Sequence, residues 1–306
     1  MSRVYSGLDR IERADAPEGY IKGCLVLEGG AFRGVYTGGV IDALMKNGIN
    51  MSAVVGVSAG ALNGVDYASG QIGRAGIATL EYRNDSRYVG TTALKNNNGI
   101  IGFDFMFGEF ADELYPFNYE RFFRKDHRYV AVASCLETGK TVYFEKDNCK
   151  EEIFRAAAAS ASMPYVSRSV EIGGRHYLDG GCTCKIPYKW ALKQGYEKII
   201  VVRTRHRSFR RKQSVKDLVM AEQIYGRRYP LFAKRLGLSS GMYNRQCDEI
   251  DRLTDEGRLY TIYPSSTEEV GRMEGDTEAL GERYWLGYND TLSQIDRIKA
   301  YLGIKG

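Results

Sequence analysis

Residues 53–60 read AVVGVSAG. The first three are apolar, as in a buried strand, and a helix-forming series begins at Ala59. Between strand and helix, Gly56, Ser58 and Gly60 form a Gly-x-Ser-x-Gly turn, whose glycines lack the side chains that would clash at so tight a corner. Such a turn presents a serine oxygen at a helix N-terminus, which favours developing negative charge. The stretch predicts a strand–turn–helix unit with Ser58 as a nucleophile for acyl transfer or ester hydrolysis.

A second glycine-rich loop lies upstream, at residues 28–34, between an apolar stretch near 23–27 and a helical stretch near 33–47. The N–H groups of such a loop can hold an anion. As a dinucleotide-binding turn the loop is incomplete, because Ala31 replaces the middle glycine of Gly-x-Gly-x-x-Gly and no acidic residue follows about 20 positions later. As an oxyanion loop it lies one βαβ crossover, about 25 residues, from Ser58, so parallel strands bring both to one sheet edge. We favour the oxyanion interpretation.

The chain has three histidines, and none is well placed as the base of a conventional triad. An α/β-hydrolase orders its triad serine, acid, histidine; only His206 lies late enough, and it stands among arginines that suit a buried imidazole poorly. His176 is expected on the opposite face of its strand from Asp179. His127, next to Lys and Asp residues, is interpreted as part of a solvated turn. An ordinary serine at a glycine-rich turn therefore stays an alternative to a nucleophile until another base is found.

Asp179 is the remaining candidate for the base. It follows the strand-like residues 175–178 and precedes Gly180 and Gly181, which turn the chain tightly. Because an aspartate with a pKa of about 3.9 is a weak base, Asp179 must be desolvated and within hydrogen-bonding reach of Ser58. An Asp-Gly pair is also an ordinary turn, so the pair by itself does not decide the role.

Taken in order, these motifs resemble those of the patatin-like phospholipases. The resemblance rests on GGAFRG at residues 29–34, GVSAG at residues 56–60 and DGG at residues 179–181, and it covers roughly residues 22 to 205. It implies that Ser58 is the nucleophile and Asp179 the proton acceptor of a Ser–Asp dyad. It also implies an oxyanion loop and a set of motif glycines. The loop residues are Gly29, Gly30, Ala31 and Arg33, and the motif glycines are Gly34, Gly56, Gly60, Gly180 and Gly181.

The composition is that of an ordinary globular protein, with 306 residues, 43% hydrophobic residues, 26% charged residues and a formal net charge of +5. The first residues lack the apolar run of a signal peptide, and the uncharged stretch 47–65 contains Asn, Ser and Gly, unlike a transmembrane helix. The six cysteines have neither disulfide-scaffold density nor zinc spacing, so we expect free thiols, a cytoplasmic protein and no metal.

Basic residues are concentrated between Arg203 and Arg235, where eleven Lys or Arg residues are accompanied only by Asp217 and Glu222. A solvated helical surface is the simplest interpretation. The functional alternative is peripheral contact with an anionic membrane, at about 1 kcal/mol per basic residue near such a surface. Nucleic-acid binding is not expected, because no recognised motif accompanies the charge.

Alternating strand-like and helical segments predict an α/β fold with a mostly parallel sheet and helices on both faces. We divide the chain into a lead-in at 1–21, a patatin-like catalytic domain at 22–205, and a mainly helical C-terminal cap at 206–306, with one strand near 259–263 and a final helix near 289–302.

The predicted function is hydrolysis of lipid acyl esters, of the phospholipase A or lipid esterase type, through a covalent acyl-enzyme and without a cofactor. An acyltransferase or thioesterase would use the same acyl-enzyme. A non-catalytic lipid-binding protein is a third alternative, against which the intact serine, aspartate and loop glycines argue. The predicted partner is a lipid or acyl-ester substrate, and the oligomeric state does not follow from the sequence.

Overall fold

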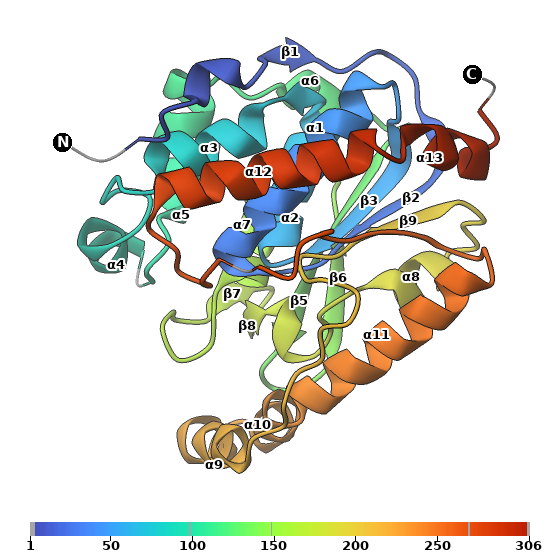
Figure 1. Cartoon of the computed structure of the whole chain (residues 1–306). Coiled ribbons are helices and arrows are strands. Elements are labelled where there is room, and N and C mark those ends of the chain that lie inside the picture. The colour runs from blue at the N-terminus through green and yellow to red at the C-terminus, as the bar shows by residue number, and fades with distance from the viewer. Residues whose placement is uncertain (1–3, 98, 148, 269, 305–306) are drawn as a thin grey trace.

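An eight-stranded sheet forms the centre of the protein (Figure 1). The computed structural model describes residues 4–97, 99–147, 149–268 and 270–304. The strand order is β10-β9-β2-β3-β5-β8-β7, and β6 also pairs with β5. The strands are β2 (Ile21–Leu27), β3 (Met51–Val57), β5 (Arg128–Cys135), β6 (Thr141–Glu145), β7 (Val170–Ile172), β8 (Arg175–Asp179), β9 (Ile199–Val202) and β10 (Tyr260–Ile262), with a separate pair β1 (Ala14–Asp15) and β4 (Gln71–Ile72).

Five neighbouring strands run parallel: β10, β9, β2, β3 and β5. The pairs of β5 with β6, β5 with β8, and β8 with β7 are antiparallel. The parallel strands are covered on both faces, which is why they are nearly continuous apolar runs. In β2, Leu25 and Leu27 belong to one core cluster, whereas Cys24 and Val26 belong to the cluster on the other face. The prediction of a mostly parallel α/β sheet is confirmed.

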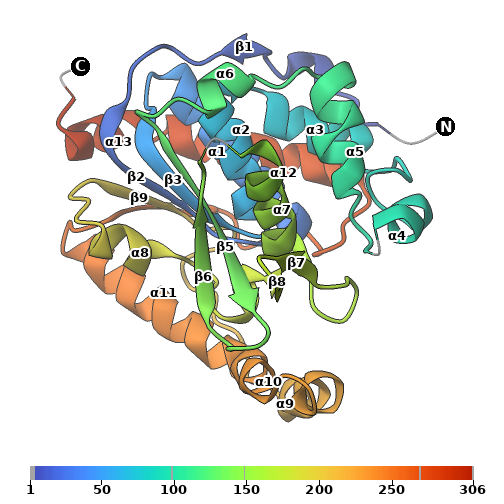
Figure 2. The ribbon, with the colours of Figure 1, turned by 180° about the vertical axis from the view of Figure 1, so that it is seen from behind.

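Helices cover both faces of this sheet (Figures 1 and 2). One face packs against α1 (Val35–Lys46), α2 (Ala59–Ser69), α7 (Lys150–Ala161) and α13 (Ile295–Leu302), and the other against α8 (Tyr188–Lys193) and α11 (Ser239–Asp255). The shorter elements are α3 (Arg74–Tyr82), α4 (Thr91–Asn97), α5 (Phe103–Phe107), α6 (Tyr119–Phe122), α9 (Val215–Ala221), α10 (Pro230–Gly237), η1 (Leu8–Arg10), η2 (Ala31–Gly34), η3 (Phe110–Leu114), η4 (Gly180–Cys182) and η5 (Glu222–Gly226). Within the described residues, no helix combines the length and hydropathy needed to cross a bilayer.

The C-terminal region contributes both a strand and a packed helix to this body. β10 extends the sheet beside β9, and α12 (Thr277–Leu292) packs along α1. The two helices approach at glycines: a Cβ atom at Gly39 would overlap the Tyr284 carbonyl, and one at Gly287 would overlap the Tyr36 carbonyl. The C-terminal residues therefore help to complete the core that carries the predicted catalytic motifs.

The final helix predicted near 289–302 is wrong in its extent, because a break at Gln294 separates α12 from α13. Gln294 leaves the helical conformation with φ −125°. Its side chain donates to the Asp290 carbonyl and accepts a hydrogen bond from the Tyr260 hydroxyl of β10. This contact with the sheet is a tertiary effect that local helix propensity does not reveal.

Strand β5 brings together the two strands that end at the predicted catalytic residues. β6 occupies one edge of β5 as far as Ser134. The other edge pairs first with β3, where Val57 lies opposite Val132, and then with β8, where Asp179 lies opposite Ala133. β3 and β8 thus approach each other end to end along β5, and their carboxyl ends meet at one point.

Candidate active site

Ser58 stands at the tight turn between β3 and α2. Its backbone has φ 57° and ψ −126°, a conformation that non-glycine residues rarely adopt. A Cβ atom at Gly56 would overlap the Gly60 carbonyl, and one at Gly60 would lie 2.5 Å from the Leu27 carbonyl oxygen. Both glycines are therefore sterically required by the turn that carries the serine.

Ser160 of α7 holds this strained turn in place. The Ser58 N–H donates to the Ser160 hydroxyl at 2.9 Å, and that hydroxyl donates to the Val132 carbonyl of β5 at 2.6 Å. Strained backbone persists only where the surrounding structure enforces it. The Ser160 hydroxyl provides this constraint by linking the Ser58 turn to β5. It bonds to the main chain of Ser58 and not to its side chain.

Two further motif glycines allow the neighbouring loops to pack on the elbow. A Cβ atom at Gly34 would lie 2.7 Å from the Ala59 Cβ atom, and one at Gly180 would overlap the Val132 carbonyl. A side chain at either position would push the loop after β2 or the Asp179 turn away from Ser58.

Asp179 ends β8 and lines the same cavity as Ser58, and the Ser58 hydroxyl lies close enough to the carboxyl group to lower the pKa of Asp179. The Asp179 Oδ1 atom also accepts the Gly181 N–H at 2.7 Å. Its backbone N–H donates to the Ser162 carbonyl, and its carbonyl accepts the Ser134 hydroxyl, both at 2.8 Å. Main chain and side chain together hold the carboxyl group against the serine hydroxyl.

The electrostatics of this contact are those of a desolvated pair. Only 6% of Asp179 and 7% of Ser58 is exposed. Burial raises the pKa of Asp179 above its ordinary value, and the hydrogen bonds from Ser58 and Gly181 partly oppose that rise. A carboxylate with a raised pKa accepts a proton more readily than one in water. Desolvation and contact with Ser58 are the two properties that a direct Ser–Asp dyad requires.

The loop after β2 lies against Ser58. The Gly29 main chain approaches so closely that a Cβ atom there would lie 3.0 Å from the Ser58 Cβ atom. Thr204, just after β9, donates from Oγ1 to the Gly29 carbonyl at 3.1 Å, and its N–H donates to Glu28 Oε2 at 2.7 Å. Because the peptide is trans, the N–H of Gly30 points away from that tethered carbonyl. Gly29 and Gly30 line the same cavity as Ser58.

The N–H groups of this loop differ in their availability. Within the described residues, no hydrogen bond engages those of Gly29, Gly30 or Ala31, whereas the Arg33 N–H donates to the Gly30 carbonyl at 3.3 Å. The first three can serve an oxyanion. The Arg33 N–H is already used inside the loop and does not fit the predicted role.

Two cavities meet at Ser58. The larger has a volume of about 430 Å³ and is bounded by the loop, by Asp179, by residues 163–166 and by parts of α9, α10 and α11. The smaller has a volume of about 60 Å³ and is lined mainly by apolar side chains, among them Phe32, Leu62, Ile101 and Met106. Ala31, Ser58 and Met163 line both cavities. An ester at Ser58 can therefore extend one part into each cavity.

Four basic side chains line the larger cavity: Arg33, Lys185, Arg211 and Arg272. In the part of the chain that the structure describes, none of the four forms an ion pair. Arg33 is only 3% exposed, and its Nε atom has no hydrogen-bond partner there. Burial and the charges of Arg205, Arg272 and Arg211 lower the pKa of Arg33. The four cations, which we call the cavity cations, therefore repel one another.

Three carboxyl groups also line this cavity, but none of them forms an ion pair with a cavity cation in the described chain. Glu28 accepts the Thr204 N–H, and Asp179 accepts the Gly181 N–H. Asp217 lies in the first turn of α9. None of the three lies within ion-pair distance of a cavity cation in the described chain, so a bound anion would meet charge that the protein itself has not neutralised.

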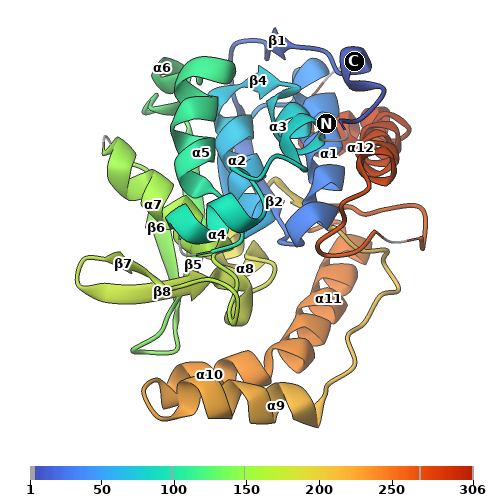
Figure 3. The ribbon, with the colours of Figure 1, turned by 90° about the vertical axis from the view of Figure 1, so that its left-hand side faces the viewer.

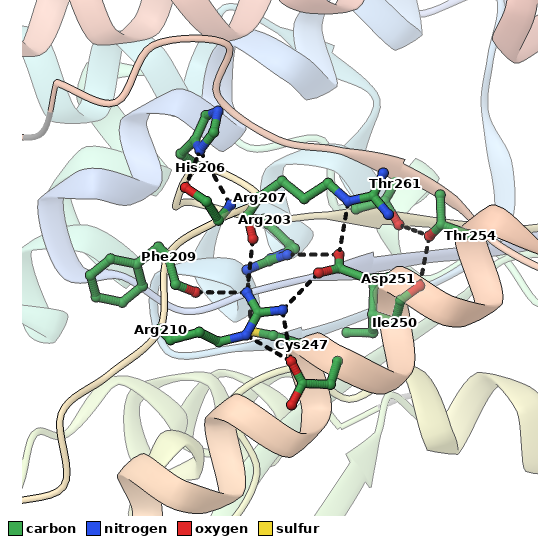
Figure 4. Close-up of polar contacts among 12 residues, drawn as sticks. Arg203, His206, Arg207, Phe209, Arg210, Cys247, Ile250, Asp251, Thr254 and Thr261 are labelled. Atoms are coloured by element: carbon green, nitrogen blue, oxygen red, sulfur yellow. Dashed lines mark hydrogen bonds and ion pairs between the residues drawn. The ribbon is translucent and has the colours of Figure 1, made fainter.

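A second group of basic side chains is neutralised by α11 (Figure 4). Arg203 has no exposed surface and pairs with Asp251 at 3.2 Å. Arg210 pairs with Asp251 at 2.8 Å, and Arg207 pairs with Asp255 at 2.7 Å. We call Arg203, Arg207 and Arg210 the α11-paired cations. They tie the segment after β9 to α11 and are not free for an external partner.

Residues 25–192, more than half of the chain, match the sequence profile of the patatin-like phospholipases. The chain belongs to this family. Residues 229–303 match a second profile, described as a domain of unknown function, DUF6363. The resemblance inferred from the three glycine motifs is thus confirmed.

Relatives and a solved structure agree with this membership. The chain is 29% identical over 185 residues to the uncharacterized protein YjjU of Escherichia coli K12, covering 59% of this chain and 51% of YjjU. It is 26% identical over 194 residues to "Probable lipid hydrolase 463L" of Invertebrate iridescent virus 6, covering 55% of this chain and 63% of that protein. The chain thus spans between half and two thirds of the length of these relatives. VipD from Legionella pneumophila shares the fold with a TM-score of 0.50 at 13% identity, over 94% of this chain and 70% of VipD.

The histidines lie apart from this patatin-like site, and neither cavity at Ser58 is lined by one. His176 bonds to Glu137 at 2.8 Å, and His206 bonds to a neighbouring serine. The prediction of a solvated His127 is wrong: the residue is 1% exposed, its ring lies 4.9 Å from that of Tyr20, and burial lowers its pKa to about 3. Among the described residues, no cluster of His, Cys, Asp or Glu side chains could hold a metal ion.

Three positioning residues escaped the sequence analysis. Ser160 lies in the small-residue stretch before the Asp-Gly motif, but nothing in that stretch singles it out. Thr204 lies two residues after the apolar strand β9, and side chains after parallel strands gather at one sheet edge, so it could have been found. Arg272 follows no regular element, and its carbonyl accepts the Phe32 N–H of the loop after β2 at 3.1 Å, a contact with no local signature.

Proposed function

We propose that this protein is a serine acyl hydrolase of the phospholipase A or lipid esterase type that acts through a Ser58–Asp179 dyad. The observation that carries the proposal is the proximity of two nearly buried side chains, Ser58 and Asp179, which line one cavity where a second cavity also reaches Ser58. Family membership and similarity to a protein named a lipid hydrolase support an acyl ester of a lipid as the substrate.

The proposed chemistry proceeds through an acyl-enzyme. Asp179 takes the proton of Ser58 as Oγ attacks the ester carbonyl carbon, and the N–H groups of Gly29, Gly30 and Ala31 stabilise the resulting oxyanion. Collapse of the tetrahedral intermediate expels the alcohol, which receives the proton from Asp179. Water then attacks the acyl-enzyme while giving a proton to Asp179. Collapse of this second tetrahedral intermediate breaks the bond between the acyl carbon and Ser58 Oγ, Oγ takes the proton back from Asp179, and the carboxylic acid is released. One oxyanion donor of this kind is worth about 2.7–4 kcal/mol.

The two cavities suggest how the substrate is oriented. The smaller, apolar cavity, of about 60 Å³, suits the start of an acyl chain. The larger cavity, with its cavity cations, suits an anionic headgroup such as a phosphate ester, because guanidinium and ammonium groups bind phosphate oxygens strongly. We therefore propose an anionic phospholipid as the preferred substrate, reached at a membrane surface; a cytoplasmic location stays a prediction.

The proposal is tested by replacing each member of the dyad. Ser58→Ala should abolish both ester hydrolysis and labelling by a serine-reactive phosphonate. Asp179→Asn keeps the shape but removes the proton acceptor, so turnover should fall by about 10³-fold or more. His176→Ala and His206→Ala serve as controls and should keep most activity. Persistent labelling of the Ser58→Ala protein, or full activity of Asp179→Asn, would refute the dyad.

An acyltransferase would share this acyl-enzyme and differ only in its acceptor. Product analysis in the presence of a competing alcohol separates the two functions: a hydrolase releases mainly the free acid, whereas a transferase forms mainly the new ester.

A further inference from the structure

Residues 212–238 form a helical hairpin, which we call the arm. It consists of α9, the π-helical turn η5 and α10, which pack on one another, and it projects from the end of the molecule that carries α11 (Figure 3). Its inner side is anchored by Ala221, Phe232 and Leu236, which belong to a small core cluster with Leu178 and Cys182. The arm therefore packs directly on the strand and turn that hold Asp179.

The outer side of the arm is unusually apolar. Exposed fractions are 74% for Val215, 58% for Leu231 and 55% for Ile224, with further apolar side chains exposed at 45–48%. Within the described residues, fourteen large hydrophobic side chains are exposed, and six of them lie on this short hairpin. They are Val215, Val219, Met220, Ile224, Leu231 and Leu238. The hairpin thus has two apolar sides, of which only the inner one is covered.

Basic side chains accompany this outer apolar surface. The arm contains six Lys or Arg residues and two acids, which gives it a formal charge of +4. In the described part of the chain, none of the six forms an ion pair, in contrast to the α11-paired cations. The six are Lys212, Lys216, Arg227, Arg228, Lys234 and Arg235. Apolar side chains bordered by unpaired cations are the composition of helices that lie in the interface of an anionic bilayer.

The arm is also continuous with the cavity that contains Ser58. Met220 and Leu236 of the arm line one side of that cavity. Tyr165, Val166 and Met273 line it as well, and each of the three is at least 39% exposed. The Tyr165 N–H and the Tyr225 hydroxyl of η5 are joined by a hydrogen bond of 3.0 Å. Exposed apolar side chains therefore line part of the cavity, from the arm and from the neighbouring loops, and we call them the apolar rim.

We propose that the arm docks this protein on the surface of an anionic lipid bilayer, with the apolar rim of the Ser58 cavity facing the lipid. The proposal names the partner of the active site and rests on the lipid hydrolase function proposed above. Docking of this kind lets a lipid ester reach Ser58 without first leaving the bilayer for water, because apolar side chains continue from the arm to the cavity.

The test uses the full chain and two arm variants. One variant combines Val215→Ser, Ile224→Ser and Leu231→Ser, and the other combines Arg227→Gln, Arg228→Gln and Lys234→Gln; none of these residues lines the Ser58 cavity. The matched control combines Leu292→Ser and Arg297→Gln, an exposed apolar and an exposed basic residue on α12 and α13. Binding and hydrolysis are measured on equimolar phosphatidylserine–phosphatidylcholine vesicles, on phosphatidylcholine vesicles, and with para-nitrophenyl butyrate in solution.

Both arm variants should bind and hydrolyse anionic vesicles roughly tenfold less well or worse, since each loses several interfacial contacts. Hydrolysis of para-nitrophenyl butyrate should be unchanged, which shows that the variants are folded and active. Wild-type binding should weaken with salt, because screening shortens the Debye length to about 3 Å at 1 M. The control should match the wild type.

Vesicle binding that survives in both arm variants would overturn the docking proposal. So would a wild-type dimer that the apolar variant dissociates, because the arm would then be covered by a second copy. Failure of the proposed function looks different: the wild type would bind anionic vesicles through the arm but hydrolyse neither the vesicle lipid nor the soluble ester.

Discussion

The cavity cations and the α11-paired cations are neighbours that differ in how their charge is balanced. Arg210 and Arg211 are adjacent in sequence, yet Arg210 pairs with Asp251 of α11, whereas Arg211 lines the Ser58 cavity with a buried Nε that has no hydrogen-bond partner in the described chain. The α11-paired cations hold a segment to a helix. The cavity cations instead repel one another, and burial together with this repulsion lowers the pKa of Arg33 and of Lys185.

This difference separates a structural role from a binding role. When a guanidinium is paired in a protein interior, removing one partner of the pair lowers the free energy of unfolding. A cationic group left unpaired beside a cavity costs stability through repulsion, and that cost is offset only when an anion arrives. Substitutions in the two groups should therefore change different measured quantities.

The largest effect is expected from Asp251→Ala. This change leaves the fully buried Arg203 guanidinium without its carboxylate, and breaking a buried pair in this way costs about 3–5 kcal/mol. Asp255→Ala is the control, because the Asp255 side chain is 63% exposed and its pair with Arg207 is worth little. Equilibrium unfolding in denaturant measures both free energies. Equal, small losses in the two variants would show that the α11-paired cations are not structural.

The glycine motifs around Ser58 and Asp179 could be found from the sequence because the conformations that they require are local. Gly56 and Gly60 are demanded by sterics within one turn, and the glycines after Asp179 mark the end of a strand in the same way. The sheet could be predicted in the same way, because a parallel strand is buried on both faces and therefore appears in the sequence as a short apolar run. These features could be read because each is encoded within a few residues.

The remaining parts of the site depend on where distant segments cross. In the sequence, the segment from Arg203 to Arg235 is basic along its whole length. In the structure, carboxylates of α11, some 40 residues onward, pair with its first arginines, whereas the basic side chains of the arm form no ion pairs in the described chain. His127 was misjudged for a similar reason, because Tyr20 from the start of the chain covers its ring. Pairing partners and covering side chains of this kind have no local signature.

A medium effect is expected from Arg211→Gln. Loss of one phosphate contact should lower kcat/KM for an anionic phospholipid about tenfold, since a hydrogen bond to a charged group is worth about 1.5–3 kcal/mol. The value for a neutral ester should not change, and the melting temperature should hold or rise because repulsion with Arg33 and Lys185 is relieved. Arg210→Gln is the control and should do the reverse, losing stability but keeping headgroup preference. A uniform loss on both substrates would make Arg211 a structural residue.

The smallest effect is a pH dependence that involves Lys185, whose Nζ atom donates to the Gly181 carbonyl at 2.7 Å. Burial and the charge of Arg211 lower the pKa of Lys185 to about 8. Below that pH the ammonium group is protonated and adds to the cavity cations; as the pH rises through about 8 it loses its charge. The preference of kcat/KM for anionic over neutral esters should therefore fall a few-fold on the alkaline side, because kcat/KM reports the ionisation of the free enzyme.

The loss of activity at low pH has a different cause, the protonation of Asp179, and it serves as an internal reference for the alkaline effect. Burial raises the pKa of Asp179, so activity on both anionic and neutral esters should be lost together as the pH falls and the carboxylate takes up a proton. Lys185→Arg keeps its charge above pH 8 and should abolish only the alkaline loss of preference, leaving the acidic limb in place. If the preference still falls above pH 8 in Lys185→Arg, another group titrates there, and Lys185 is not the member of the cavity cations that responds to pH.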